Sequence, residues 1–352
     1  MIFRSRRRRE EDGGVAVADA PSAAEADTRP LEEIFAEIAE TEAANRDKRD
    51  RELERRLLRL RHRAGARLVA EAGERPDQPL PAEDRLPGRP EGGLPEIAAK
   101  DLTPELLRAG MLRDGSVLVR GVIDPDDAAR MAADIDRAFE ERAALWDGED
   151  VEDPNYEEFW PEPPYAMAER QWVRDGGGVL AGDCPRTMFD LLDLFERAGL
   201  RSVITSYLGE RAAMSLNKST LRRARPSDGG AWHQDGAFMG DVRALNVWLS
   251  LSHCGDVAPG LDVIPRRLDG IVPTGTEGAI FDWSVSPAVA EETAGRDGVV
   301  RPIFEPGDVL LFDELCLHTT ALEPSMTETR YAVESWFFGP SAFPGAYVPI
   351  AF

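Results

Sequence analysis

The stretch that organises this chain is Ala231-Trp232-His233-Gln234-Asp235-Gly236. It places a histidine and an aspartate two residues apart, shortly before a strand-like segment at 244–251. If the pair is extended, the side chains of His233 and Asp235 point to the same face, because successive side chains of a strand alternate. An imidazole and a carboxylate on one face make up two-thirds of a 2-His-1-carboxylate metal site.

The third ligand has to come from another part of the chain. The histidines are His62, His233, His253 and His318. His318 follows a strand-like run at 308–312, and we predict that it completes the triad. We interpret His253 as a structural or rim residue and His62 as a solvated residue of an arginine-rich helix. Three ligands on one side of an iron leave positions for a bidentate 2-oxoacid and for dioxygen, which is why non-haem Fe(II) oxygenases use this set.

An arginine follows at a fitting place. Arg330 comes twelve residues after His318 and just before the last strand-like segment, 331–338. A guanidinium is a planar, two-pronged donor that suits a carboxylate. We therefore expect Arg330 to receive the distal carboxylate of such an oxoacid.

Composition narrows the class of protein. The chain has 352 residues and a formal net charge of -23, which argues against nucleic acid as a partner because phosphates would be repelled. No apolar run reaches the roughly 18 residues of a membrane span. The arginines at 6–9 are followed by acidic residues and not by an apolar segment, so no export signal is predicted and a cytoplasmic location is expected.

The cysteines predict neither a disulfide framework nor a zinc ribbon. Cys184, Cys254 and Cys316 are odd in number, far apart and in no paired motif. Cys316 lies two residues before His318, so it either lines the same pocket or is a small buried residue. Both interpretations stay open.

The chain divides into four parts. Residues 1–29 are predicted to be a disordered tail of acidic and basic residues. Residues 30–73 form an amphipathic helical arm of one or two helices, which either forms a coiled-coil homo-oligomer or lies on the main domain. Residues 74–100 are a Pro/Gly-rich linker, and 101–352 form the main domain.

The main domain changes character along its length. A strand at 116–122 precedes a helix from Pro125 to Glu140, with Asp124 as its N-cap, and a second helix is predicted at 187–208. Short strands separated by Gly/Pro turns follow; the candidates are 213–221, 245–252, 261–264, 298–304, 308–313 and 331–338. Helices first and short strands afterwards indicate an α+β chain whose C-terminal half is a sandwich or jelly roll.

The segment 217–336 resembles the phytanoyl-CoA dioxygenase family of Fe(II)/2-oxoglutarate-dependent oxygenases, and 102–139 resembles the leading strand and helix of that family. The matching motifs are Trp232-His233-Gln234-Asp235-Gly236, Asn246-Val247-Trp248-Leu249-Ser250, Pro259-Gly260-Leu261-Asp262-Val263-Ile264-Pro265, Pro306-Gly307-Asp308-Val309-Leu310-Leu311-Phe312, Leu317-His318-Thr319-Thr320 and Thr329-Arg330-Tyr331-Ala332-Val333-Glu334-Ser335-Trp336.

The resemblance implies a double-stranded β-helix (jelly roll, cupin-like) with helices packed on it. It implies Fe(II) held by His233, Asp235 and His318, 2-oxoglutarate as cosubstrate, and O2. The distal carboxylate of 2-oxoglutarate would pair with Arg330 and be held by the hydroxyl of Thr320. The cosubstrate would also contact Trp248 and Asn217; ordinary core packing remains an equal interpretation for Trp248.

The implied chemistry is hydroxylation of a small-molecule substrate, with release of succinate and CO2. Related halogenases lack the carboxylate ligand, which frees a position for halide, so the retained Asp235 favours hydroxylation or a related C–H oxidation.

The substrate itself is not indicated. Departures from the family pattern at 257–260 and 323–326 lie near the expected rim of the site, where they leave the substrate class open. The arginines Arg222, Arg223 and Arg225 either receive an anionic group or form a solvated loop. Two other functions stay open: a non-catalytic jelly-roll binding protein that assembles through its N-terminal helix, and a cupin-type metalloenzyme that does not use 2-oxoglutarate.

Overall fold

The computed structural model describes residues 29–77 and 86–352. Nearly all of the predicted tail and part of the predicted linker therefore lie outside the described residues. The α-helices are α1 (Leu31–Lys48), α2 (Arg51–Ala70), α3 (Pro104–Asp114), α4 (Pro125–Trp146), α5 (Arg170–Asp175), α6 (Pro185–Arg197), α7 (Leu200–Leu208), α8 (Gly236–Met239) and α9 (Pro287–Ala294). The strands are β1 (Glu96–Ala98), β2 (Ser116–Arg120), β3 (Gly178–Leu180), β4 (Ala213–Ala224), β5 (Ala244–Ser250), β6 (Gly260–Val263), β7 (Val309–Phe312), β8 (His318–Ala321), β9 (Arg330–Phe338) and β10 (Pro349–Ala351).

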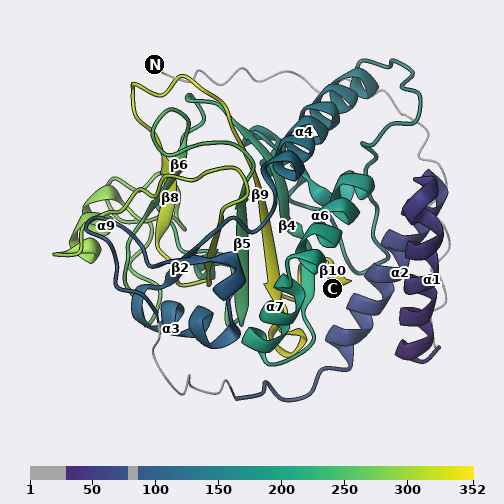
Figure 1. Cartoon of the computed structure of the whole chain (residues 1–352), viewed down its shortest axis with the longest axis horizontal. Helices are drawn as coiled ribbons and strands as arrows, with labels where there is room; N and C mark the ends of the chain where they lie inside the picture. The colour runs from purple at the N-terminus through teal and green to yellow at the C-terminus, as the bar shows by residue number, and fades with distance from the viewer. Residues whose placement is uncertain (1–28, 78–85) are drawn as a thin grey trace.

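The strands form two sheets. The large sheet has the order β1-β2-β7-β5-β9-β4-β10, with β3 joined to β4, and is antiparallel except where β1 meets β2. The small sheet pairs β6 with β8 and is widened by single bridges from His233 to His318 and from Val263 to Val300. Figure 1 shows α4, α6 and α7 on one side of the large sheet and the small sheet on the other. This arrangement confirms the predicted α+β class and its double-stranded β-helix.

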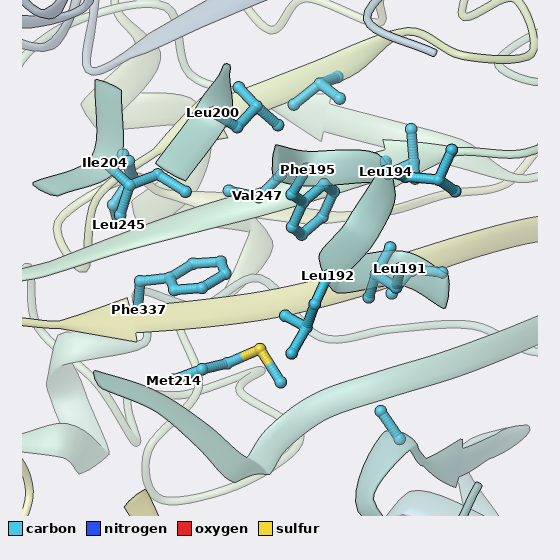
Figure 2. Packing of buried hydrophobic residues seen from close by; sticks show 14 of the residues in the cluster. Leu191, Leu192, Leu194, Phe195, Leu200, Ile204, Met214, Leu245, Val247 and Phe337 are labelled. Atoms are coloured by element: carbon cyan, nitrogen blue, oxygen red, sulfur yellow. The ribbon is translucent and has the colours of Figure 1, made fainter. Parts of the chain in front are cut away.

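The large sheet is buried on both faces, as strand β5 illustrates. Leu245 and Val247 point into the core shared with the helices, whereas Trp248 points into the core shared with the small sheet. In Figure 2, Leu245 and Val247 lie with Phe195 of α6 and Ile204 of α7. Burial of each such side chain contributes about 1.5 to 3 kcal/mol to the free energy of folding. The packed large sheet therefore supports the residues on the face that meets the small sheet.

The N-terminal arm consists of two helices that lie on the main domain. The chain turns between α1 and α2 at Arg49, which has a φ of 50°, and Asp50 caps α2 by accepting from the amide groups of Glu52 and Leu53. The predicted apolar stripe packs between the two helices and against Ala351 of β10; its buried members are Ile34, Ile38, Leu57, Leu60 and Ala64. Of the two possibilities for the arm, the structure shows docking on the main domain; a homo-oligomer through residues 30–73 stays a prediction.

His62 corrects one prediction. It is not solvated: only 2% of it is exposed, its Nδ1 lies 2.9 Å from the carbonyl oxygen of Pro349, and its ring packs edge-on against Phe159 and Tyr165. The helical pattern placed His62 among arginines but could not show that this face of α2 meets β10.

Other differences concern element boundaries. The predicted helix at 187–208 is two helices, because Gly199 takes a left-handed φ of 74° between α6 and α7. The segment 298–304 is not a regular strand and joins its neighbours by single bridges at Val300 and Phe304. Strand β1 lies within the predicted linker and pairs with β2. No helix of the described residues is both long enough and apolar enough to span a membrane.

Candidate metal centre

His233 and His318 meet through their backbones. The amide of each donates to the carbonyl oxygen of the other, at N–O distances of 3.0 Å and 3.1 Å, which is the pattern of a hydrogen-bonded antiparallel pair. Their imidazole rings consequently lie side by side, with centroids 4.4 Å apart. The bridge between His233 and His318, at the start of β8, thus brings together two histidines that are far apart in the sequence.

Asp235 joins them, but by a different route from the predicted one. It is not extended: its φ of -61° and ψ of -29° are helical, and it is the N-cap residue of the short helix α8. The turn directs its carboxylate back, so that Oδ2 lies 3.8 Å from Nε2 of His233 and 3.9 Å from Nε2 of His318. The three ligand atoms all lie within 4.8 Å of one another, a spacing that suits one metal ion. The structure therefore brings the predicted triad together, although the strand alternation invoked for it was wrong.

Gln234 anchors this turn, and no sequence pattern singled it out. Its side chain is fully buried; Nε2 donates to the carbonyl oxygens of Leu315 (2.7 Å) and Gly270 (3.1 Å), and Oε1 accepts from the amide of Val272 (2.8 Å). These hydrogen bonds hold in place the turn that carries His233 and Asp235, the two predicted ligands on either side of Gln234.

Backbone contacts orient both imidazoles. Nδ1 of His233 lies 2.8 Å from the carbonyl oxygen of Ala231, and Nδ1 of His318 lies 3.1 Å from that of Cys316. With Nδ1 protonated toward a carbonyl, Nε2 keeps its lone pair for a metal. Burial, helped by the neighbouring His233, lowers the pKa of His318 to about 4, so its imidazole is neutral at physiological pH. The donor set fits Fe(II) in a 2-His-1-carboxylate site.

Arg330 is a buried cation with no anionic partner among residues 29–77 and 86–352. It is 3% exposed, and Nη1 donates to the carbonyl oxygen of Gly260 at 3.0 Å. It forms no ion pair within the described residues, and its buried Nε has no acceptor there. Burial lowers the pKa of Arg330 to about 10, yet it stays charged near neutral pH. A bound carboxylate would neutralise this buried guanidinium and accept a hydrogen bond from its unpaired N–H group.

Two of the other predicted cosubstrate residues lie in suitable places. Thr320 stands two residues after His318 on β8, so both side chains face the same side of the strand. Trp248 lies under the guanidinium of Arg330, 5.4 Å from ring centroid to Cζ, and also packs on Phe304 at 4.7 Å. Trp248 is thus a core residue that borders the arginine.

Asn217 is engaged elsewhere. Its Nδ2 donates to the carbonyl oxygen of Ala166 and to Glu169, and its Oδ1 accepts from the amide of Val348 at 2.7 Å. Both ends of the amide therefore hold neighbouring segments together in this conformation, and contact between Asn217 and the cosubstrate stays a prediction.

The remaining candidates do not join the triad. His253 lies at the surface between Glu305 and Asp256, in agreement with a structural or rim role. The three cysteines are all buried and free, which agrees with the predicted absence of a disulfide framework.

The arginine cluster divides: Arg225 lies in the loop after β4 with its side chain 71% exposed, as the solvated-loop prediction has it, whereas Arg222 and Arg223 are held on the strand by acidic side chains. Arg222 and Arg223 lie on β4 and pair with Glu334 and Asp136, at 3.1 Å and 2.8 Å. Arg225 pairs at longer range, 3.5 Å, with Asp228. These side chains thus form ion pairs within the protein.

Residues that the sequence interpretation missed border the triad. Glu334 lies on the same face of β9 as Arg330. Burial alone would raise the pKa of Glu334, but the positive charges of Arg222 and Lys218 outweigh burial and lower this pKa to about 2. Nζ of Lys218 lies 3.7 Å from Oδ1 of Asp235. The period of two along β9 could have identified Glu334, whereas nothing in the sequence placed Lys218 beside Asp235.

Three solved structures show what this chain is similar to in fold. One is AviO1 from Streptomyces viridochromogenes Tue57, with 18% identity, a TM-score of 0.41, and coverage of 67% of this chain and 94% of that one. Another is EctD from S. alaskensis with 2-oxoglutarate and 5-hydroxyectoine, with 17% identity, a TM-score of 0.46, and coverage of 78% and 92%. A third is the epimerase SnoN in complex with Fe3+, alpha ketoglutarate and nogalamycin RO, with 18% identity, a TM-score of 0.41, and coverage of 67% and 83%. No curated protein gives a significant match.

The decisive comparison is with a family. The sequence model of phytanoyl-CoA dioxygenase (PhyH) matches residues 111–323, which is more than half of the chain. The match includes His233, Asp235 and His318, and Arg330 lies beyond its end. The chain therefore belongs to the phytanoyl-CoA dioxygenase family of Fe(II)/2-oxoglutarate-dependent oxygenases.

Proposed function

We propose that this protein is a non-haem Fe(II)- and 2-oxoglutarate-dependent dioxygenase that hydroxylates a small-molecule substrate and releases succinate and CO2. The observation that carries the proposal is that the structure contains both a candidate metal triad and a buried arginine suited to a carboxylate. The carboxylate and imidazole groups of Asp235, His233 and His318 converge within 4.8 Å, and Arg330 is buried without an anionic partner among the described residues.

Each residue has a role that its surroundings support. Nε2 of His233, Nε2 of His318 and Oδ2 of Asp235 would hold the iron, and the backbone contacts of both Nδ1 atoms keep the imidazoles oriented. Arg330 would pair with the distal carboxylate of 2-oxoglutarate, with the hydroxyl of Thr320 as a further donor. When bound, iron and 2-oxoglutarate supply the oxidative decarboxylation that activates dioxygen.

The position of Asp235 supports hydroxylation as the outcome. Its carboxylate fills the coordination position that a halide would need, so transfer of halogen is not favoured. The protein would contribute by holding the substrate C–H bond beside the triad and by excluding water from it.

The test is an anaerobic titration with Fe(II) and 2-oxoglutarate, followed by admission of O2 and measurement of succinate. We expect the visible charge-transfer band of a bidentate oxoacid complex, and succinate only when both components are present. His233→Ala and Asp235→Ala should abolish both signals, whereas His253→Ala, a surface histidine away from the triad, should retain them.

The same measurement separates the alternatives. Unchanged activity in Arg330→Ala would favour a cupin-type metalloenzyme that does not use 2-oxoglutarate. Failure to bind either component would favour a non-catalytic binding protein. We also propose a cytoplasmic location, which the three free, buried cysteines support because a reducing compartment keeps thiols free.

A further inference from the structure

Lys218 lies beside the triad and near the ring of Phe238. Its Nζ is 3.7 Å from Oδ1 of Asp235 and 4.1 Å from the ring centroid of Phe238, and its side chain is 20% exposed. Oδ2, the other oxygen of Asp235, faces the two histidines. Nζ donates no hydrogen bond to any residue in the described part of the chain, so its three N–H groups are available to a ligand.

The acidic groups nearest Lys218 are already occupied. Glu334 receives Nε and Nη2 of Arg222, at 3.2 Å and 3.1 Å, and also Nε1 of Trp336 at 3.2 Å. Asp235 is a predicted iron ligand and would be shared with the metal. Lys218 thus forms an ion pair with Asp235 that is longer than a hydrogen bond, and a bound iron would compete for the same carboxylate.

Four aromatic side chains continue outward from the triad and are called here the aromatic wall: Phe238, Trp283, Phe281 and Trp172. Trp283 contacts His233 edge-on at 5.8 Å and Phe238 at 5.4 Å, and it stacks on Phe281 at 4.9 Å with an interplanar angle of 9°. Trp172 of α5 contacts Trp283 at 6.1 Å and remains 57% exposed. Large aromatic groups that stay exposed beside a reactive centre are suited to cover an apolar molecule.

We propose that Lys218 binds a carboxylate of the substrate while the aromatic wall covers a flat, apolar body of the same molecule. One ammonium supplies one positive charge, which matches a carboxylate; a phosphate dianion would bring excess negative charge beside Asp235 and Glu334. The substrate class is thus an aromatic or similarly flat carboxylic acid. This inference rests on the proposed function only in taking the triad as the place of reaction.

Binding measurements on the full chain test the assignment. The probes are phenylacetate, 3-phenylpropionate and indole-3-acetate, each compared with its neutral carboxamide, and binding is followed by quenching of tryptophan fluorescence. The titrations are run anaerobically with Fe(II) and saturating 2-oxoglutarate, and again on metal-free protein. A charge-assisted hydrogen bond predicts that at least one acid binds roughly tenfold to a hundredfold more tightly than its amide.

Variants assign the preference to residues. Lys218→Met, which keeps the stem and removes the charge, should lose the preference for acid over amide, and Lys218→Arg should retain it. Trp283→Ala should weaken 3-phenylpropionate relative to propionate, and Trp160→Ala, an exposed tryptophan outside the wall, should leave that ratio unchanged. Thermal unfolding of each variant confirms that it is folded.

Several results would overturn the proposal. They are equal binding of acids and amides by the wild type, no binding of any acid, or an unchanged preference in Lys218→Met. A loss of 2-oxoglutarate affinity in Lys218→Met would also overturn it, because the lysine would then serve the cosubstrate. If the acids bind as expected and 2-oxoglutarate does not, the proposed function fails while the assignment of Lys218 stands.

Discussion

Replacing Arg330 by methionine should remove cosubstrate binding without destabilising the fold. Burial lowers the pKa of Arg330 from its ordinary value of 12.5 to about 10. At about 1.36 kcal/mol per pKa unit, keeping this charge in the core costs about 3 kcal/mol. The hydrogen bond to Gly260 and the contact with Trp248 return about 1 kcal/mol each. Arg330→Met, which keeps much of the apolar volume, should therefore raise the free energy of unfolding by about 1 kcal/mol.

Arg222→Met is the matched control, because it makes the same change at a paired arginine. It would leave Glu334 buried without its guanidinium. Breaking a fully buried pair costs about 3 to 5 kcal/mol, and the partial exposure of Arg222 reduces this to roughly 2 to 3 kcal/mol. The two variants should thus shift stability in opposite directions in urea unfolding of metal-free protein.

The affinity for 2-oxoglutarate should fall sharply in Arg330→Met. Loss of a buried charge partner costs about 2 to 5 kcal/mol, or roughly thirtyfold to several thousandfold in Kd. Anaerobic calorimetry with Fe(II) present measures this directly. The reasoning would be refuted if Arg330→Met bound 2-oxoglutarate normally, or if it lost more than about 1 kcal/mol of stability, since the arginine would then be a structural residue.

Three further predictions concern the triad and the arm. Asp235→Ala should lower Fe(II) affinity at least tenfold in calorimetry while the thermal midpoint of the metal-free protein changes little; retention of wild-type affinity would exclude this carboxylate as a ligand. Burial lowers the pKa of His62 in the folded protein below its ordinary value of about 6.5. At pH values below about 6.5, His62 therefore binds a proton more readily in the unfolded chain than in the folded one, and the free energy of unfolding should fall as the pH drops through this range. In urea unfolding at pH 8 and pH 5.5, His62→Gln should show a smaller loss than the wild type; an equal loss would mean that His62 does not contribute. Gly65→Ala should destabilise the protein by about 1 to 3 kcal/mol although alanine favours helices, because the added Cβ would meet the backbone of Ile350 at 2.8 Å. Gly73→Ala is the control, because the space around Gly73 is open. Equal free energies of unfolding for the two variants would show that α2 tolerates the added methyl group.

The site could be predicted in its chemistry more reliably than in its geometry. His233, Asp235 and His318 were identified from residue type and order, because a metal triad requires those donors whatever the backbone does. The assumption that Asp235 is extended was wrong, because a helical turn anchored by Gln234 directs its carboxylate to the same point. Residue spacing along the chain predicts which side chains converge, and tertiary contacts decide the backbone conformation by which they do so.

Burial was the main quantity that sequence patterns could not supply. His62 lies in an arginine-rich helix, and the pattern of that helix does not show which face meets β10. Strand β8 has only four residues, two of them threonine, and its hydrophobic pattern is too short to distinguish it from a loop. Its pairing with β6 and with residue 233 defines it as a strand.

The sequence by itself determined the family and the α+β class and predicted the donors of the triad, because these depend on residue types in a fixed order along the chain. Only the tertiary structure showed that Arg330 is buried without an anionic partner in the described residues and that Lys218 lies beside Asp235. Both facts depend on which strands become neighbours and on which charges find partners, and no local pattern encodes such long-range pairings. The His-x-Asp stretch thus predicts an oxygenase, and the fold around it provides the charges through which we propose that the cosubstrate and the substrate are recognised.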